Sequence, residues 1–187
     1  MKKIFILIPS FIMTGPIKGA IALANCLSLE REVYLVTIKK LVAYEPVINS
    51  NIKTICLADH SSNYFQKVFY YRNLLKDAGA KDDIISISML FSADLINSFC
   101  YKYASICSSI RGNLPEAYRM DYGYKGYILG VFHLIFLRRF CKLVTMSDQM
   151  KKQVKYYSGK DSKIIGNFVD EVQLEPYRLK KIIDIKS

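Results

Sequence analysis

This sequence lacks tryptophan and contains only two histidines, His60 and His133, which stand far apart along the chain. Its five cysteines are scattered, are odd in number and form no C-x-x-C pair. Zinc sites and disulfide frameworks depend on close, regular spacing of these two residue types. The pattern therefore argues against a structural metal site. It favours reduced, mostly buried cysteines in a cytoplasmic protein.

Acidic residues are also scarce, with 16 Asp and Glu against 27 Lys and Arg, which gives a formal net charge of +11. Such an excess favours anionic partners, namely nucleic acid, phosphorylated substrates or an acidic membrane face. The basic residues are dispersed rather than clustered in a stripe, and no nucleic-acid-binding signature is present. We therefore expect no nucleic-acid partner.

No apolar run approaches the roughly 18 to 20 residues that a membrane-spanning helix needs. The first residues resemble a secretory signal, because Met1-Lys2-Lys3 is basic, an apolar run follows, and small residues lie at 22–24. Pro9 and the turn at 14–16 interrupt that run, however, and the same residues also make a strand, a glycine loop and a helix. We expect a cytoplasmic protein.

Short apolar segments alternate with segments of helical periodicity along most of the chain, which is typical of a parallel sheet. With 51% hydrophobic residues the chain can bury a proper core. The fold predicted is α/β, a single Rossmann-like doubly wound parallel sheet with helices on both faces. We expect residues 1–170 to form this domain and 171–187 to be a helical tail or linker remnant. The strands are predicted at 3–9, 32–38, 52–57, 83–88, 103–110, 142–146 and 163–165.

Ligands of open α/β sheets bind beyond the carboxyl ends of the strands. There the segment Thr14-Gly15-Pro16-Ile17-Lys18-Gly19 joins a strand to a helix. Glycine allows a phosphate to approach the backbone, and a helix N-terminus favours negative charge. The spacing matches neither a P-loop nor a dinucleotide fingerprint. A structural turn is an equal alternative.

Arg111 and Asn113 follow another predicted strand, in a polar segment that also contains Tyr118 and Asp121. An arginine there can clamp a phosphate or an array of sugar hydroxyls; the alternative is a solvated loop. Ser147 precedes a predicted helix and serves either as a ligand contact or, more simply, as its cap. We interpret His133 as a packed histidine in an apolar helix.

The segment 124–142 is apolar on nearly all sides and carries basic residues at its ends. One interpretation is a buried helix in the outer layer of the fold. The other is a surface helix that dips into an anionic bilayer face, an arrangement that basic flanks favour.

Taken together, these segments resemble the N-terminal, acceptor-binding domain of GT-B glycosyltransferases of family 4, which is one half of a GT-B fold. MTGPIKGAIALANCL and EVYLVTI are similar to the family's glycine loop, first helix and second strand, and LVTMSDQMKKQV resembles a later strand and helix. KIIGNFVD is similar to its K-x-x-x-I-P-N-G-V-D segment. Gly166 and Phe168 replace the usual proline and glycine. The histidine expected after the fourth strand is absent.

The resemblance implies transfer of a sugar, as by a hexosyltransferase, from a nucleotide-sugar to a lipid-linked saccharide in surface polysaccharide biosynthesis. It implies no metal and no cofactor, and a nucleotide-sugar donor that binds through a second domain absent here. The chain alone is then expected to be inactive. Its catalytic residues are not identified. The substrate-binding residues expected are Gly15, Pro16, Lys18, Arg111, Asn113, Ser147 and Asn167.

The partners expected are a separate donor-domain polypeptide and either an anionic membrane surface or a lipid-linked glycan acceptor. The protein would then be cytoplasmic, with a peripheral position on the inner face of the plasma membrane. The alternative is a non-catalytic Rossmann-like protein that binds anionic lipid or sugar phosphates at that surface.

Overall fold

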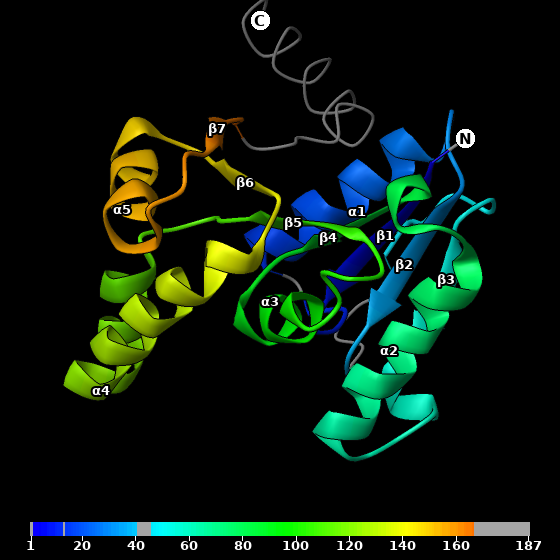
Figure 1. Ribbon diagram of the computed structural model, residues 1–187, viewed down its shortest axis with the longest axis horizontal. Helices are drawn as coiled ribbons and strands as arrows, with labels where there is room; N and C mark the ends of the chain where they lie inside the picture. Colours follow the sequence, from blue (N-terminus) through cyan, green and yellow to red (C-terminus); the bar gives the residue numbers. More distant parts are fainter. Residues whose placement is uncertain (1, 13, 41–45, 167–187) are drawn as a thin grey trace, which may run out of the picture.

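The computed structural model describes residues 2–12, 14–40 and 46–166, and within them one parallel sheet of seven strands forms the centre (Figure 1). The strand order is β3-β2-β1-β4-β5-β6-β7, and each pair of neighbours is parallel. This confirms the predicted fold class. The strands are β1 (Lys3–Ile8), β2 (Val33–Thr37), β3 (Lys53–Cys56), β4 (Ile84–Ser88), β5 (Ser105–Ser109), β6 (Lys142–Thr145) and β7 (Lys163–Ile164).

The chain changes direction across the sheet between β1 and β4. From β1 it moves outward to β2 and β3, then returns to place β4 on the other side of β1 and continues to β7. In register, Ile6 of β1 lies opposite Leu35 of β2 and Ile87 of β4. The carboxyl ends of β1 and β4 therefore form the topological switch point, where ligands of such sheets bind.

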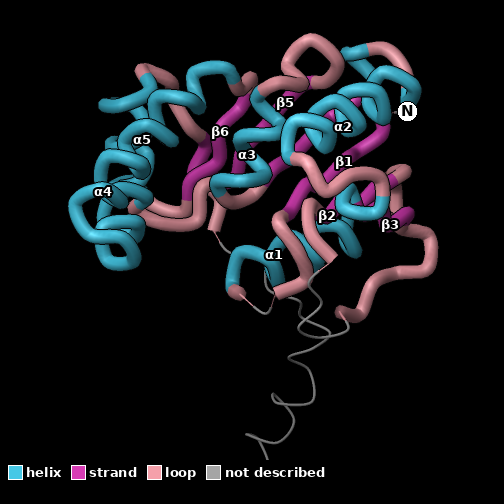
Figure 2. The backbone as a smooth tube through the Cα atoms, turned by 90° about the horizontal axis from the view of Figure 1, so that it is seen from below, coloured by secondary structure: helices cyan, strands magenta, loops and turns pink. Residues whose placement is uncertain are grey.

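Helices cover both faces of the sheet, as predicted, with α1 on one side and α2 and α3 across the strands from it (Figure 2). The helix α1 (Gly15–Leu27) buries Ile17 and Ala20 against alternate residues of β1 such as Ile6. On the opposite face, Phe5 belongs to a core formed with α2 (Tyr64–Ala78) and α3 (Phe91–Ser98). Strand residues alternate between the two cores because successive side chains point to opposite faces.

The largest difference from the sequence prediction lies in α4 (Leu114–Phe136), because the segment expected to be a polar loop starts this helix. Asn113 is its N-cap, and Pro115 lies in its first turn. The backbone departs from helical geometry at Gly123, with φ 65° and ψ −148°. The two halves of α4 then fold back on each other (Figure 1).

Two glycines permit the close approach of these halves. A Cβ atom on Gly126 would lie 1.8 Å from the carbonyl oxygen of Tyr118, and one on Gly130 would lie 2.6 Å from the Cα of Pro115. No larger residue fits at either position without moving backbone. The contact brings residues near 118 beside residues near 133.

Further elements close the described fold. The helix α5 (Asp148–Ser158) is followed by β7, and short 3-10 helices lie at η1 (Leu57–Asp59), η2 (Lys81–Asp83) and η3 (Leu137–Arg139). Asn63 caps α2 by accepting from the Phe65 N–H at 2.9 Å. In the described part of the chain no helix has both the length and the apolar character needed to cross a bilayer. The predicted tail 171–187 and Asn167 lie outside the described residues.

Candidate functional site

A cavity of about 210 Å³ lies at the switch point, beyond the carboxyl ends of β1, β4 and β5. Pro16 at the start of α1 borders it on one side and Leu90, which follows β4, on another. The two halves of α4 close the remaining side. The residues that contribute polar side chains to the lining are Asp94, Ser109, Arg111, Tyr118, Asp121 and His133.

Part of the lining carries positive charge and hydrogen-bond donors. Burial lowers the pKa of the Arg111 guanidinium from its ordinary value, but arginine stays charged at neutral pH. Its Nη1 donates to the carbonyl oxygen of Gly166 at 3.4 Å, which ties the segment after β5 to the end of β7. The amino end of α1, at Pro16, adds a favourable potential for an anion. The hydroxyl of Ser109, a residue only 5% exposed, has no hydrogen-bond partner among the described residues.

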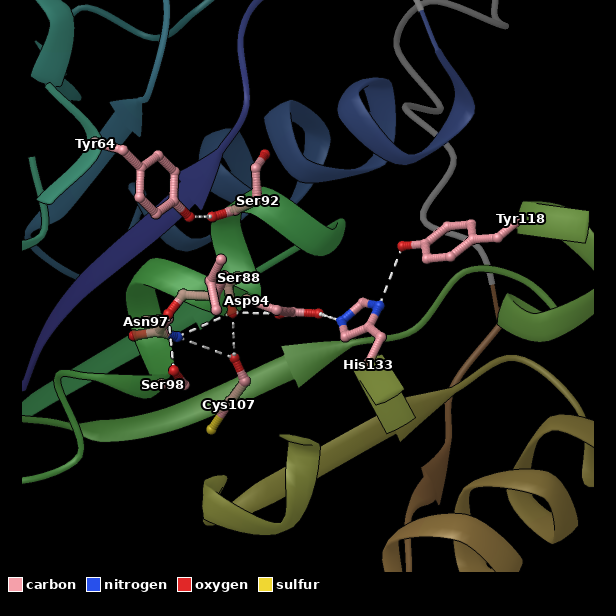
Figure 3. Close-up of polar contacts among 10 residues, drawn as sticks. Tyr64, Ser88, Ser92, Asp94, Asn97, Ser98, Cys107, Tyr118 and His133 are labelled. Atoms are coloured by element: carbon pink, nitrogen blue, oxygen red, sulfur yellow. Dashed lines mark hydrogen bonds and ion pairs between the residues drawn. The ribbon is translucent and has the colours of Figure 1, made fainter. Parts of the chain in front are cut away.

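The lining also contains a hydrogen-bonded row of three side chains, two of them buried (Figure 3). Oδ2 of Asp94 lies 2.8 Å from Nε2 of His133, and Nδ1 of His133 lies 3.1 Å from the Tyr118 hydroxyl. Asp94 and His133 are each 1% exposed. The Phe91 ring packs edge-on against His133, with centroids 5.0 Å apart, and excludes water from the pair.

The local sequence explains how this row is held. Ser88, the last residue of β4, donates to Oδ1 of Asp94 at 2.6 Å. Asn97, one helical turn after Asp94, donates to the Ser88 hydroxyl at 3.0 Å. The network continues through Ser86 to the hydroxyl of Tyr71 on α2. A buried network whose members are satisfied is rigid, so the Asp94 carboxylate is fixed in position.

Backbone strain marks the same place. Leu90 has φ 74° and ψ 157°, a region that residues other than glycine rarely occupy, and its side chain lines the cavity. Such conformations cost about 1 to 3 kcal/mol and cluster at ligand sites. The strained turn after β4 places α3, and with it Asp94, at the floor of the cavity.

Burial raises the pKa of the Tyr118 hydroxyl well above its ordinary value, and Asp94, Tyr122 and Asp121 nearby add to the increase. Tyr118 therefore keeps its proton throughout the neutral range. A protonated phenol can give one hydrogen bond and accept others, so it can serve both His133 and a ligand.

The predicted site residues lie in different places. Arg111 and Pro16 line the cavity, whereas Gly15 and Lys18 are exposed on the first turn of α1 and do not belong to its lining. Asn113 caps α4, 3.5 Å from the Glu116 N–H, and also accepts from the Gln153 amide at 2.5 Å. Ser147 caps α5, as predicted, 3.3 Å from the Met150 N–H. Ligand roles for these residues stay predictions, and Asn167 lies outside the described residues.

The sequence prediction missed Asp94 and the role of its partner. His133 is packed, as expected, but both of its ring nitrogens are hydrogen-bonded and it borders the cavity. A signal did exist for α3, because Asp94 and Asn97 stand three residues apart on the buried face of an otherwise apolar helix. Polar groups in such positions need buried partners.

Within the described ranges, no three His, Cys, Asp or Glu side chains gather closely enough to hold a metal ion. The cavity is also smaller than the 300 to 1,000 Å³ of usual small-molecule sites. It therefore suits a small ligand or one group of a larger ligand.

Comparison with known proteins supports the fold and no more. No family model and no curated protein matches the sequence. Among solved structures, the N-terminal domain of a trehalose-6-phosphate phosphatase from Candida albicans matches with a TM-score of 0.50 and 12% sequence identity. The match covers 86% of this chain and 43% of that one, so this chain spans less than half the length of that neighbour. The likeness shows a Rossmann-like α/β fold; it does not confirm membership of glycosyltransferase family 4.

Proposed function

We propose that this protein is the acceptor-binding half of a GT-B type glycosyltransferase that builds surface polysaccharide, and that the cavity at the switch point holds the acceptor. The observation that carries the proposal is the lining of the cavity. It contains both Arg111 and the hydrogen-bonded row Asp94, His133, Tyr118. Sugar hydroxyls both donate and accept hydrogen bonds, and a linked phosphate matches the arginine.

The resemblance described above supports the reaction class. In that class the nucleotide-sugar binds to a second domain, which faces the carboxyl edge of the first sheet. The open carboxyl edge of β1, β4 and β5 is the corresponding edge of this chain. Donor sugar and linkage would then be selected by a separate polypeptide or domain, and the chain alone would be inactive.

A transfer assay tests this proposal. Tagged protein is isolated with its bound proteins, and the complex is incubated with radiolabelled UDP-, GDP- and dTDP-sugars and a lipid extract of its own cells. We expect label in the lipid fraction from the complex and none from the chain alone. Arg111→Ala should reduce transfer at least tenfold, whereas Arg119→Ala, exposed on α4, should not. Turnover by the chain alone, or an unchanged Arg111→Ala complex, would refute the proposal.

A second function, the non-catalytic capture of anionic lipid at a membrane surface, is favoured by the outer side of α4. Tyr124, Ile128 and Phe132, all in the half of α4 that follows Gly123, are 77%, 53% and 54% exposed, and their four-residue spacing places them on one side of the helix. Arg139, just after α4, lies over the Phe136 ring at 5.2 Å and adds positive charge. An apolar helix side beside basic residues suits the interface of an anionic bilayer. The same surface would bring a glycosyltransferase to a lipid-linked acceptor.

Liposome flotation tests whether α4 is the membrane contact. We expect binding to vesicles that contain phosphatidylglycerol, weaker binding to pure phosphatidylcholine, and weakening as salt is raised. Phe132→Glu should abolish flotation, while Leu29→Glu, at an exposed apolar residue after α1, should leave it intact. Equal flotation of both variants would remove α4 as the membrane contact.

A further inference from the structure

We infer that Tyr118 presents a hydrogen-bond acceptor to the cavity, so that the ligand bound there is a phosphorylated sugar with a hydroxyl donor at Tyr118 and its phosphate at Arg111. This inference rests on the proposed function for the location of the ligand, and it adds the ligand's chemical class and orientation. Tyr118 and Arg111 both line the same cavity.

The direction of the hydrogen bonds follows from the buried carboxylate. Both oxygens of Asp94 are engaged, Oδ1 by the Ser88 hydroxyl at 2.6 Å and Oδ2 by Nε2 of His133 at 2.8 Å. An ionised carboxylate only accepts hydrogen bonds, so Nε2 of His133 carries the hydrogen. Where His133 is neutral, the other nitrogen, Nδ1, then has a lone pair and accepts, whereas in an imidazolium both nitrogens would donate.

Tyr118 is the donor to that lone pair. Its hydroxyl lies 3.1 Å from Nδ1 of His133, and the two rings are stacked with centroids 6.1 Å apart. The hydroxyl has a single hydrogen, and His133 takes it. What Tyr118 has left to offer a ligand is the lone pairs of its oxygen, which accept from a ligand hydroxyl and repel a phosphate oxygen.

Arg111 has the opposite preference. Arginine donates hydrogen bonds and accepts none, and the amino end of α1 beside Pro16 also favours an anion. The buried Ser109 hydroxyl belongs to the same lining and can donate to an anion. A ligand that satisfies both Arg111 and Tyr118 must carry a negative group and a hydroxyl. A sugar phosphate has this pattern; inorganic phosphate and a neutral sugar each match one of the two residues only.

Isothermal titration of the full chain at pH 8 tests the inference with three probes: glucose 1-phosphate, cyclohexyl phosphate and inorganic phosphate. Cyclohexyl phosphate has a ring of similar size without hydroxyls. We expect glucose 1-phosphate to bind about tenfold more tightly than cyclohexyl phosphate, because the cyclohexyl ring leaves a buried acceptor unpaired. Tyr118→Phe should remove this advantage and leave the affinity for inorganic phosphate unchanged. Arg111→Gln should weaken all three probes.

Tyr122→Phe is the matched control, since Tyr122 lies on the same helix with its side chain 68% exposed, and it should behave as wild type. The inference is overturned if wild type does not distinguish glucose 1-phosphate from cyclohexyl phosphate, if no probe binds, or if Tyr118→Phe preserves the difference. Selective binding without sugar transfer in any complex would support the inference and overturn only the proposed transfer activity.

Discussion

His133 and Asp94 form a buried pair in which Nε2 lies 2.8 Å from Oδ2, and it joins the second half of α4 to α3. Each residue is 1% exposed, so neither group has water as a substitute partner. Removing one member of such a pair leaves the other buried and unsatisfied, which costs more than the pair itself contributes. Substituting one member of the pair therefore tests how much the pair contributes to the stability of the core beneath the cavity.

Asp94→Ala should lower the free energy of unfolding by about 3 kcal/mol, because it strands the His133 N–H and the Ser88 hydroxyl. Urea unfolding followed by circular dichroism gives the value. Asp121→Ala, an exposed residue of the same cavity, should change stability by less than about 0.5 kcal/mol. Equal losses of unfolding free energy in the two variants would show that the buried pair stabilises the fold no more than an exposed residue does.

The glycines of α4 and α1 should respond in opposite directions to alanine. Gly130→Ala places a Cβ 2.6 Å from the Pro115 backbone, so we expect at least 2 kcal/mol of destabilisation from the forced separation of the α4 halves. Gly19→Ala, in α1 with no atom within 4 Å of the added Cβ, should stabilise by about 0.5 to 1 kcal/mol through helix propensity. Thermal unfolding of the two variants settles the comparison. A stable Gly130→Ala protein would contradict the folded-back arrangement of α4.

Leu90 offers a direct measurement of stored strain. Leu90→Ala removes the side chain and keeps the unfavourable φ of 74°, whereas Leu90→Gly removes both. We expect the glycine variant to be more stable than the alanine variant by about 1 kcal/mol, the reverse of the usual order at ordinary backbone angles. If urea unfolding finds the alanine variant more stable, the turn after β4 is not strained.

Alkaline conditions should destabilise the protein through buried thiols. Burial raises the pKa of Cys100 from 9.0 to about 12, and that of Cys107 from 9.0 to about 11. Above pH 9 the unfolded chain loses these protons while the folded chain keeps them, so stability falls as pH rises toward the folded values. Below pH 9 neither thiol contributes a slope.

Urea unfolding in reducing buffer between pH 8 and 10.5 measures this effect. The Cys100→Ala protein should lose stability less steeply with pH than wild type, whatever its absolute stability. Cys26→Ala, at an exposed thiol, should retain the wild-type slope. Parallel curves for Cys100→Ala and wild type would contradict the raised pKa.

Much of the fold could be predicted from local patterns. Runs such as Lys3–Ile8 and Val33–Thr37 are apolar and short, and they lie between helical segments, so strand, helix and parallel topology were all recoverable. The cap of α5 was also recoverable, because Ser147 directly precedes the helical segment. The start of α4 was missed because its glycines and tyrosines interrupt the helical periodicity. Among them, Gly126 and Tyr118 meet where the two halves of α4 contact each other.

The sequence by itself determined which segments are buried and in what layers. The spacing of hydrophobic residues that shows this is a property of residues close together along the chain. It also placed Arg111 and Pro16 at the ligand-binding edge of the sheet. Only the tertiary structure decided that Asp94, Tyr118 and His133 meet there. Their contacts span 15 and 39 residues and depend on the bend at Gly123 and on the side from which α4 returns. Local patterns do not encode which faces of distant elements meet, so the polarity of the cavity emerges only when the chain is folded.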